Sequence, residues 1–109
     1  MSHYFSEKQE VKSDRKIIKY EIENKKFEFV TDNGVFSKAK VDFGTDVMLK
    51  VFLRENLDKK SQKFDVLDIG CGYGVVSVVI KSFFENVRTV SSDVNERALE
   101  LTRENLLRN

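Results

Sequence analysis

Three glycines at alternate positions, directly after an acidic residue, are the feature of this sequence with the clearest chemical potential. The segment reads Asp68-Ile-Gly-Cys-Gly-Tyr-Gly74. Glycines let the backbone turn sharply and let a ligand approach without a Cβ atom in the way. If a helix begins directly after the turn, its free N–H groups face the ligand as well. The spacing predicts a ligand-binding turn, and a tight structural turn without a ligand is the alternative.

A second carboxylate, Asp93, follows Asp68 by 25 positions and could complete such a site. At the end of a neighbouring parallel strand it would lie next to the glycine turn. A carboxylate there can accept hydrogen bonds from both hydroxyls of a nucleotide ribose, an arrangement that nicotinamide and adenosyl cofactors share. In the alternative interpretation, Asp93 only helps to begin the next helix.

The glycine spacing bears on which nucleotide is expected. The dinucleotide fingerprint is G-x-G-x-x-G, and Val75 occupies the position of its third glycine here. The observed pattern, an acidic residue followed by G-x-G-x-G, resembles motif I of the class I S-adenosylmethionine-dependent methyltransferases. An NAD-dependent oxidoreductase, which would share the strand, the turn and the terminal carboxylate, remains the rival hypothesis.

The residues around both carboxylates predict a parallel βαβα unit over residues 64–109. Phe64–Ile69 has the length and β-branched content of a buried strand. Val75–Phe84 is rich in valine, but a parallel partner strand needs a crossover of about a dozen residues, so we expect a helix. Val87–Asp93 is the expected second strand, and an amphipathic helix follows from its cap Asn95 to Arg108.

The residues before this unit predict a hairpin and one more helix. Lys16–Ile22 and Lys25–Thr31 are rich in β-formers, with a turn between them, so residues 15–31 form the expected β-hairpin. A loop containing Asn33-Gly34 precedes a helix over about residues 42–55. We expect Thr45 to cap that helix. Its expected apolar face consists of Val47, Met48, Val51 and Phe52. Residues 1–14 are expected to be a mobile tail or an edge segment.

Composition bounds the classes of protein that are expected. The chain has 109 residues, 40% of them hydrophobic and 34% charged, which suits one small globular domain. Its net charge of +1 gives no general attraction to nucleic acid or to an anionic membrane. One cysteine and one histidine argue against a disulfide framework and a structural zinc site. The amino-terminal segment does not have the apolar core of a signal peptide, so we expect a cytoplasmic protein. We expect neither a bound metal nor a membrane anchor.

Four blocks in order extend the resemblance to a particular family. These blocks are Asn33–Ser37, Val41–Thr45, Val66–Gly74 and Asp93–Ala98. Together with the opening His3-Tyr4-Phe5, they resemble the "methyltransferase small" domain, typified by the small-subunit ribosomal RNA guanine-N2 methyltransferases. The resemblance implies a Rossmann-like α/β class I methyltransferase fold preceded by a small β-element. It also implies S-adenosylmethionine as the methyl donor and a guanine in ribosomal RNA as the acceptor.

The resemblance also assigns roles to residues, all of them in cofactor binding and none of them catalytic. Gly70, Cys71 and Gly72 would lie along the methionine part of the cofactor. Asp93 would hold the ribose with Val94 beside the adenine. Gly44 and Thr45 would close over the carboxylate end. With Asp68 and Gly74 of motif I, these residues form the expected cofactor site.

One departure from the family concerns the acceptor. Family members continue further and carry an Asn-Pro-Pro-aromatic motif that positions the target amine, whereas this sequence contains no proline. We therefore expect only the cofactor-binding, amino-terminal part of the domain and no turnover from this chain alone. A non-catalytic fragment that acts by pairing with another chain is the second alternative. The open edge of its short sheet would favour self-association.

Overall fold

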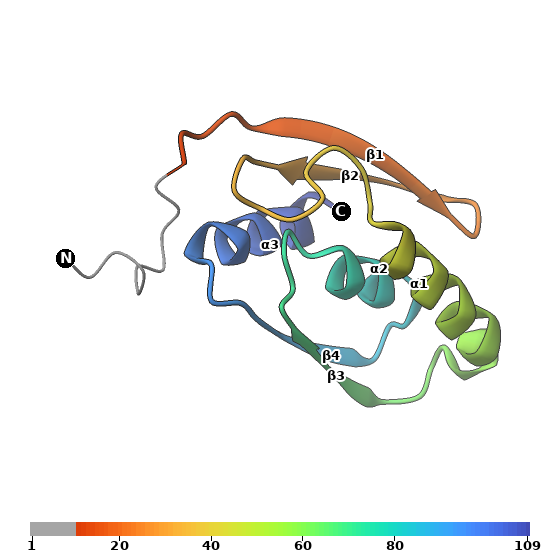
Figure 1. Cartoon of the computed structure of the whole chain (residues 1–109). Coiled ribbons are helices and arrows are strands. Elements are labelled where there is room, and N and C mark those ends of the chain that lie inside the picture. The colour runs from red at the N-terminus through yellow and green to blue at the C-terminus, as the bar shows by residue number, and fades with distance from the viewer. Residues whose placement is uncertain (1–10) are drawn as a thin grey trace.

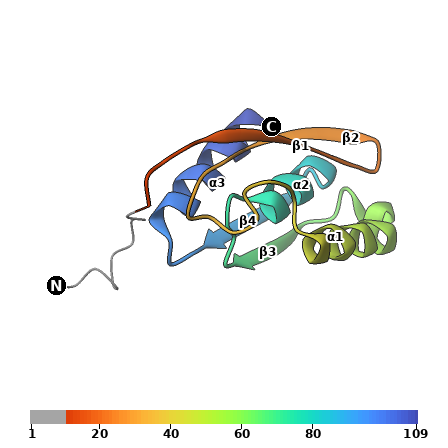
Figure 2. The ribbon, with the colours of Figure 1, turned by 45° about the horizontal axis from the view of Figure 1, so that its top comes forward.

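A computed structural model describes residues 11–109 of the chain, in which two small sheets enclose a layer of helices (Figure 1). The elements in order are β1 (Lys16–Ile22), β2 (Lys25–Thr31), α1 (Phe43–Asn56), the short 3-10 helix η2 (Leu57–Lys59), β3 (Phe64–Ile69), α2 (Val75–Phe83), β4 (Val87–Ser92) and α3 (Glu96–Arg108). The hairpin β1–β2 lies across α2 and α3 on one side (Figure 2), and the parallel pair β3–β4 lies on the other. This is the predicted α/β class, a hairpin followed by a parallel βαβα unit.

The hairpin forms where the sequence predicts it. β1 and β2 pair antiparallel, and the two-residue turn between them places Glu23 and Asn24 at φ values of 48° and 65°. Positive φ at both turn residues suits the right-handed twist of the strands. Phe27 and Phe29 are buried while Lys26 and Glu28, which alternate with them, are exposed, so the hairpin presents its aromatic face to the helices.

The parallel unit also follows the prediction, with α2 connecting β3 to β4. Leu67 pairs with Val90 and Asp68 with Ser91 in the parallel register. β4 ends at Ser92, one residue before Asp93, so Asp93 begins the connection to α3. Asn95 caps α3 as expected, because its side-chain oxygen accepts hydrogen bonds from the N–H groups of Arg97 and Ala98.

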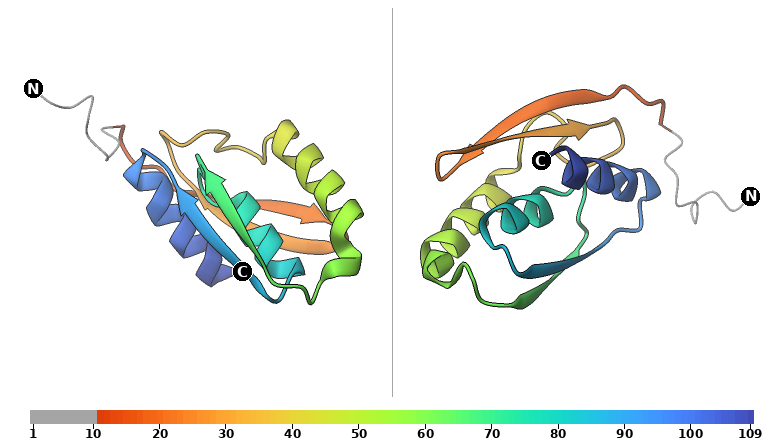
Figure 3. Two further views of the ribbon diagram at one scale, coloured as in Figure 1. Left: turned by 90° about the horizontal axis from the view of Figure 1, so that it is seen from below. Right: turned by 180° about the vertical axis from the view of Figure 1, so that it is seen from behind.

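The expectation that β3 is a buried strand is wrong for one of its faces. Leu67 is 65% exposed and Ile69 is 76% exposed, while Val66 and Phe64 on the opposite face pack against the core. α2 and α3 cover that inner face. Seen from below, β3 and β4 lie in front of both helices (Figure 3), and no element within residues 11–109 covers the outer face.

The predictions for α1 need two corrections. Its cap is Asp42 instead of Thr45, since Asp42 Oδ2 accepts a hydrogen bond from the Thr45 N–H at 3.2 Å. The buried residues are Leu49 and Leu53, whereas Val47, Met48 and Val51 are exposed. Of the predicted apolar face only Phe52 is partly buried, against Phe64 and Phe84. The helix has apolar residues on more than one side. Its position at the side of the molecule decides that Leu49 and Leu53 are the ones that are buried.

The expected tail divides at the limit of the described residues. Residues 1–10, with His3-Tyr4-Phe5, lie outside them. Beyond these, Ser13 donates a hydrogen bond to Asp32 at 2.6 Å, and the Asp14 N–H donates to Asp32 at 2.7 Å. Residues 12–14 are thus fixed against the loop that follows β2.

Candidate functional site

A cavity of about 310 Å³ opens at the carboxyl ends of β3 and β4. Four segments of the chain form it: the loop after β2, the start of α1, the glycine turn, and the residues after β4. We call residues 33–37 the cavity loop. The lining residues that the sequence predicts are Thr45, Asp68, Gly70, Cys71, Gly72 and Asp93. The volume lies at the lower end of the roughly 300–1,000 Å³ typical of small-molecule sites.

The glycine turn is folded back onto the end of β4. The N–H groups of Gly70 and Cys71 both donate to the Ser92 carbonyl, at 2.8 and 3.0 Å. Gly70 and Gly72 have φ values of +72° and +59°, and a Cβ added to either would meet nothing within 4 Å. Both therefore need left-handed backbone, and both leave free space where other residues would carry a side chain.

Gly74 has a different place from the other two glycines. It does not line the cavity, and its φ is +99°. An added Cβ would lie 3.1 Å from the Cα, Cγ2 and Oγ1 atoms of Thr102. Gly74 thus lets α2 begin in close contact with α3, which is a packing requirement.

Asp93 bridges the glycine turn and the start of α3. Its Oδ2 accepts from the Gly72 N–H at 2.9 Å, and its Oδ1 accepts from the Asn95 N–H at 2.9 Å. Each carboxylate oxygen can accept more than one hydrogen bond. Asp93 therefore positions the turn and still has acceptor capacity for hydroxyl groups in the cavity.

Asp68 lies deeper, at the end of β3. The hydroxyl of Ser77 donates to Asp68 Oδ2 at 3.1 Å and lies 2.8 Å from the hydroxyl of Ser91. Burial raises the pKa of Asp68, and the charge of Asp93 raises it further, while the Ser77 hydrogen bonds oppose the shift. A cation bound in the cavity would reverse this effect, since it favours the ionised carboxylate.

Cys71 lines the cavity but is not an activated thiol. Its Sγ lies 3.4 Å from Thr102 Oγ1. Burial raises the pKa of the Cys71 thiol, and the carboxylates of Asp68 and Asp93 add to the shift. A thiol kept protonated is a poor nucleophile, so the side chain contributes surface to the cavity.

The structure does not bring every predicted residue to the cavity. Thr45 lines it beside Asp42, but Gly44 does not. Val94 is 90% exposed and also lies outside the lining. Sequence reasoning missed other lining residues, among them Asp42, Tyr73, Asn95 and the cavity-loop residues Gly34, Val35, Phe36 and Ser37. The available signals were the Asn33-Gly34 turn and the helix cap at Asn95, each of which was interpreted only locally.

Residues 26–109 match the family model of the methyltransferase small domain. The chain belongs to this family. An uncharacterised protein of Bacillus subtilis, YbxB, is 40% identical over 107 residues, which are 98% of this chain and 51% of that protein. The ribosomal RNA small subunit methyltransferase C of Actinobacillus pleuropneumoniae serotype 3 is 40% identical over 76 residues, 70% of this chain and 22% of that protein. This methyltransferase small domain thus spans about half the length of the first relative and less of the second.

The fold of this methyltransferase small domain is also found in a solved structure. The Thermus thermophilus 16S rRNA N2 methyltransferase RsmC, in complex with AdoMet and guanosine, superimposes with a TM-score of 0.75 at 22% sequence identity. The match covers 85% of this chain and 24% of that chain. The predicted class, the amino-terminal part of a class I methyltransferase fold, is confirmed.

Two further findings concern membranes and metals. Within residues 11–109, no helix combines the length and the apolar character that a membrane crossing needs. In the same part of the chain, no three His, Cys, Asp or Glu side chains come together in a way that could hold a metal ion.

Proposed function

We propose that this chain carries the S-adenosylmethionine site of a methyltransferase that modifies the N2 amine of a guanine in ribosomal RNA. The observation that carries the proposal is the cavity at the carboxyl ends of β3 and β4, lined by Asp68, Gly70, Cys71 and Gly72 of motif I together with Asp93. In open α/β sheets this is the place where nucleotide ligands bind.

The shape and chemistry of the cavity fit the cofactor. Gly70 and Gly72 leave open space where a Cβ would otherwise project, which gives a ligand close access to the backbone. Asp93 offers carboxylate oxygens for ribose hydroxyls, and Asp68 offers a carboxylate for an ammonium group. When bound, S-adenosylmethionine supplies an electrophilic methyl group. The proposed role of this chain is to bind the cofactor and to orient that group, and no residue of this chain is proposed as catalytic.

The family supports this cofactor over NAD. Val75 takes the place of the third glycine of the dinucleotide fingerprint, is buried, and forms the first residue of α2. Together with the family match, this makes the adenosyl cofactor the better-supported hypothesis. The proposed substrate rests on the names of the relatives. One relative is a ribosomal RNA small subunit methyltransferase, and the solved structure with the same fold contains AdoMet and guanosine.

The acceptor base is proposed to bind residues that the relatives have and this chain does not cover. The Bacillus subtilis relative is about twice as long as the aligned segment, and the outer face of β3–β4 is uncovered within residues 11–109. We therefore expect this chain alone to bind the cofactor without methylating RNA.

Isothermal titration calorimetry of the 109-residue chain tests the cofactor. We expect binding of S-adenosylhomocysteine, the product form of the cofactor, and no binding of NAD. A preference for NAD, or no binding of S-adenosylhomocysteine, would contradict the proposal. A methyl-transfer assay on small-subunit ribosomal RNA tests the second part: we expect no turnover with this chain alone.

A further inference from the structure

We propose that Asn95, together with Arg97 and Tyr73, is a positioning residue that holds the cavity loop in place as a wall of the cofactor site. This inference rests on the proposed function and adds to it: cofactor affinity depends on side chains that hold the wall as well as on those that touch the ligand. The loop belongs to the connection between the hairpin and α1, far from the glycine motif in sequence.

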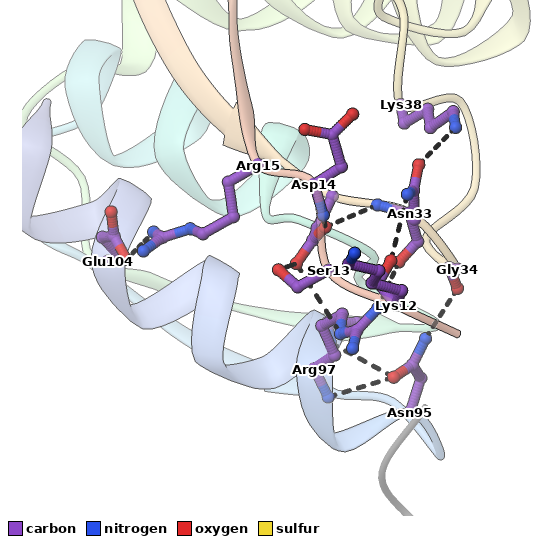
Figure 4. A network of polar contacts seen from close by, with 12 residues as sticks. Lys12, Ser13, Asp14, Arg15, Asn33, Gly34, Lys38, Asn95, Arg97 and Glu104 are labelled. Atoms are coloured by element: carbon purple, nitrogen blue, oxygen red, sulfur yellow. Dashed lines mark hydrogen bonds and ion pairs between the residues drawn. The ribbon is translucent and has the colours of Figure 1, made fainter. Parts of the chain in front are cut away.

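The first end of the cavity loop is held by the start of α3 (Figure 4). Asn95 Nδ2 donates to the Gly34 carbonyl at 3.0 Å, and Arg97 Nη1 donates to the Asn33 carbonyl at 2.7 Å. Arg97 Nε also lies 3.7 Å from the carboxylate of Asp32, which is 3% exposed. Two side chains of one helix therefore fix two consecutive carbonyls of the loop.

The second end is held by the glycine turn. The hydroxyl of Tyr73 donates to the Ser37 carbonyl at 3.1 Å. Ser37 has a φ of 58°, a left-handed conformation that a residue with a side chain keeps only where its surroundings hold it. The Ser37 hydroxyl donates to the Lys40 carbonyl at 2.5 Å and adds to this restraint. Between the two fixed ends, Val35 is buried and Phe36 is exposed at the cavity.

The same residue, Asn95, connects this wall to the predicted ribose ligand. Its backbone N–H donates to Asp93 Oδ1, and its side chain donates to the Gly34 carbonyl of the cavity loop. Asp93 in turn holds the Gly72 N–H. A chain of hydrogen bonds therefore runs from the glycine turn through Asp93 and Asn95 to the cavity loop. Loosening one contact lowers the fraction of molecules with a closed wall, and apparent affinity falls with that fraction.

Asn95→Ser separates this role from helix capping. Serine is as good a cap as asparagine, so the hydrogen bonds to the N–H groups of Arg97 and Ala98 can be replaced. It is too short to reach the Gly34 carbonyl. The matched control is Asn86→Ser, because Asn86 Nδ2 also donates to a loop carbonyl, that of Ser61, at 2.6 Å. Neither Asn86 nor Ser61 lines the cavity. Tyr73→Phe is a second variant that removes only the hydroxyl contact with Ser37.

Two measurements decide the proposal. Hydrogen exchange of the Val35 amide, which donates to the Asp32 carbonyl at 3.3 Å, reports loop opening without a ligand. Calorimetry with S-adenosylhomocysteine reports affinity. In Asn95→Ser we expect about three- to ten-fold faster exchange and about three- to ten-fold weaker binding, the loss of one hydrogen bond. Tyr73→Phe should weaken binding in the same range. Asn86→Ser should change neither quantity.

The outcomes distinguish this inference from the proposed function. Unchanged Val35 exchange in Asn95→Ser would overturn it, as would faster exchange with unchanged affinity. If the parent chain fails to bind S-adenosylhomocysteine, the proposed function fails and the ligand part of the inference fails with it. In that case the exchange measurement alone still decides whether Asn95 holds the loop.

Discussion

At the scale of single residues, the glycines of motif I divide into two kinds. Gly72 faces open space in the cavity, whereas Gly74 faces the backbone of Thr102 at 3.1 Å. Both have positive φ, so any substitution strains the backbone at either position. Only at Gly74 does the new side chain also meet neighbouring atoms that cannot move easily.

Alanine substitutions should separate these roles. We expect Gly72→Ala to lower the free energy of unfolding by about 1–2 kcal/mol, the penalty of left-handed alanine. Gly74→Ala should lose about 1–3 kcal/mol more, because its Cβ overpacks the contact between α2 and α3. Gly72→Ala, although the more stable of the two variants, should be the one that weakens S-adenosylhomocysteine binding. Urea denaturation and calorimetry measure the two effects, and equal stabilities would contradict the packing role of Gly74.

The sequence predicts Asp68, Gly70, Gly72 and Asp93 at the cavity because their positions follow from strand ends and a local motif. It does not predict the separate role of Gly74 or the contribution of Asn95. Both depend on contacts with segments distant in sequence, Thr102 of α3 in one case and Gly34 of the cavity loop in the other. Positions that follow from the parallel βαβ topology could be predicted, whereas contacts that depend on how α3 and the cavity loop dock could not.

At the scale of elements, α3 continues the hydrogen bonding of β2. The buried Asn105 accepts from the Val30 N–H at 2.8 Å and donates to the Val30 and Tyr73 carbonyls at 3.0 and 2.8 Å. One turn later, Asn109 accepts from the Glu28 N–H and donates to the Glu28 carbonyl. Two amide side chains thus satisfy backbone groups along the strand edge, which the sequence pattern of an amphipathic helix did not reveal.

Asn105→Ala should therefore be costly. We expect a loss of about 2–4 kcal/mol in the free energy of unfolding, since buried backbone groups of Val30 and Tyr73 are left without partners. Asn109→Ala is the matched control and should lose less than about 1 kcal/mol, because water can replace its exposed contacts. Urea denaturation measures both. Similar losses for the two variants would show that burial does not decide the value of these bonds.

Asp32 links the segment before β1 to α3 and gives the fold a dependence on pH. Burial tends to raise the pKa of Asp32. Hydrogen bonds from Ser13, from the N–H groups of Asp14 and Asn33, and the charge of Arg97 outweigh it, so the pKa is lowered overall. A lowered carboxyl pKa stabilises the folded state above the unfolded value of about 3.9, and this contribution is lost as the pH falls through the folded pKa.

Asp32→Asn tests this linkage. The stability gap between the parent chain and the variant should be largest near about pH 6 and should narrow as the pH falls below the unfolded value of about 3.9 and through the lower folded pKa. Urea denaturation at several pH values measures the gap. Asp14→Asn, a change at an exposed carboxylate nearby, is the matched control, because it leaves in place the backbone N–H that donates to Asp32. A gap for Asp32→Asn that is independent of pH would contradict the charge-based account.

Helix α1 shows why element positions were predicted better than element faces. Its bounds differ from the prediction by one residue, yet Leu49 and Leu53 are buried where Val47, Met48 and Val51 were expected. Apolar side chains occur on several sides of this helix, so periodicity alone cannot show which side is buried against the rest of the protein. The position at which the helix docks decides which of its sides is buried.

At the scale of the whole molecule, the parallel sheet is covered on one face only. Leu67, Ile69 and Val90 expose apolar side chains on the outer face, within the part of the chain that the structure describes. Parallel sheets are usually covered on both faces. The sequence predicted a buried strand because Phe64–Ile69 is apolar on both sides. The composition of β3 is that of a strand in a parallel sheet covered on both faces.

Leu67→Ser and Val66→Ser compare the two faces of this strand directly. Leu67→Ser should change the free energy of unfolding by less than about 0.5 kcal/mol, because its side chain is exposed. Val66→Ser should lose about 1–2 kcal/mol, because Val66 packs against the core on the inner face.

We also expect the 109-residue chain to self-associate as its concentration rises, through this sheet and its open edge, and Leu67→Ser to weaken that association. Sedimentation velocity over a concentration series measures it. A parent chain that stays monomeric throughout would contradict the self-association prediction, and a Leu67→Ser variant as unstable as Val66→Ser would show that the outer face is covered in solution.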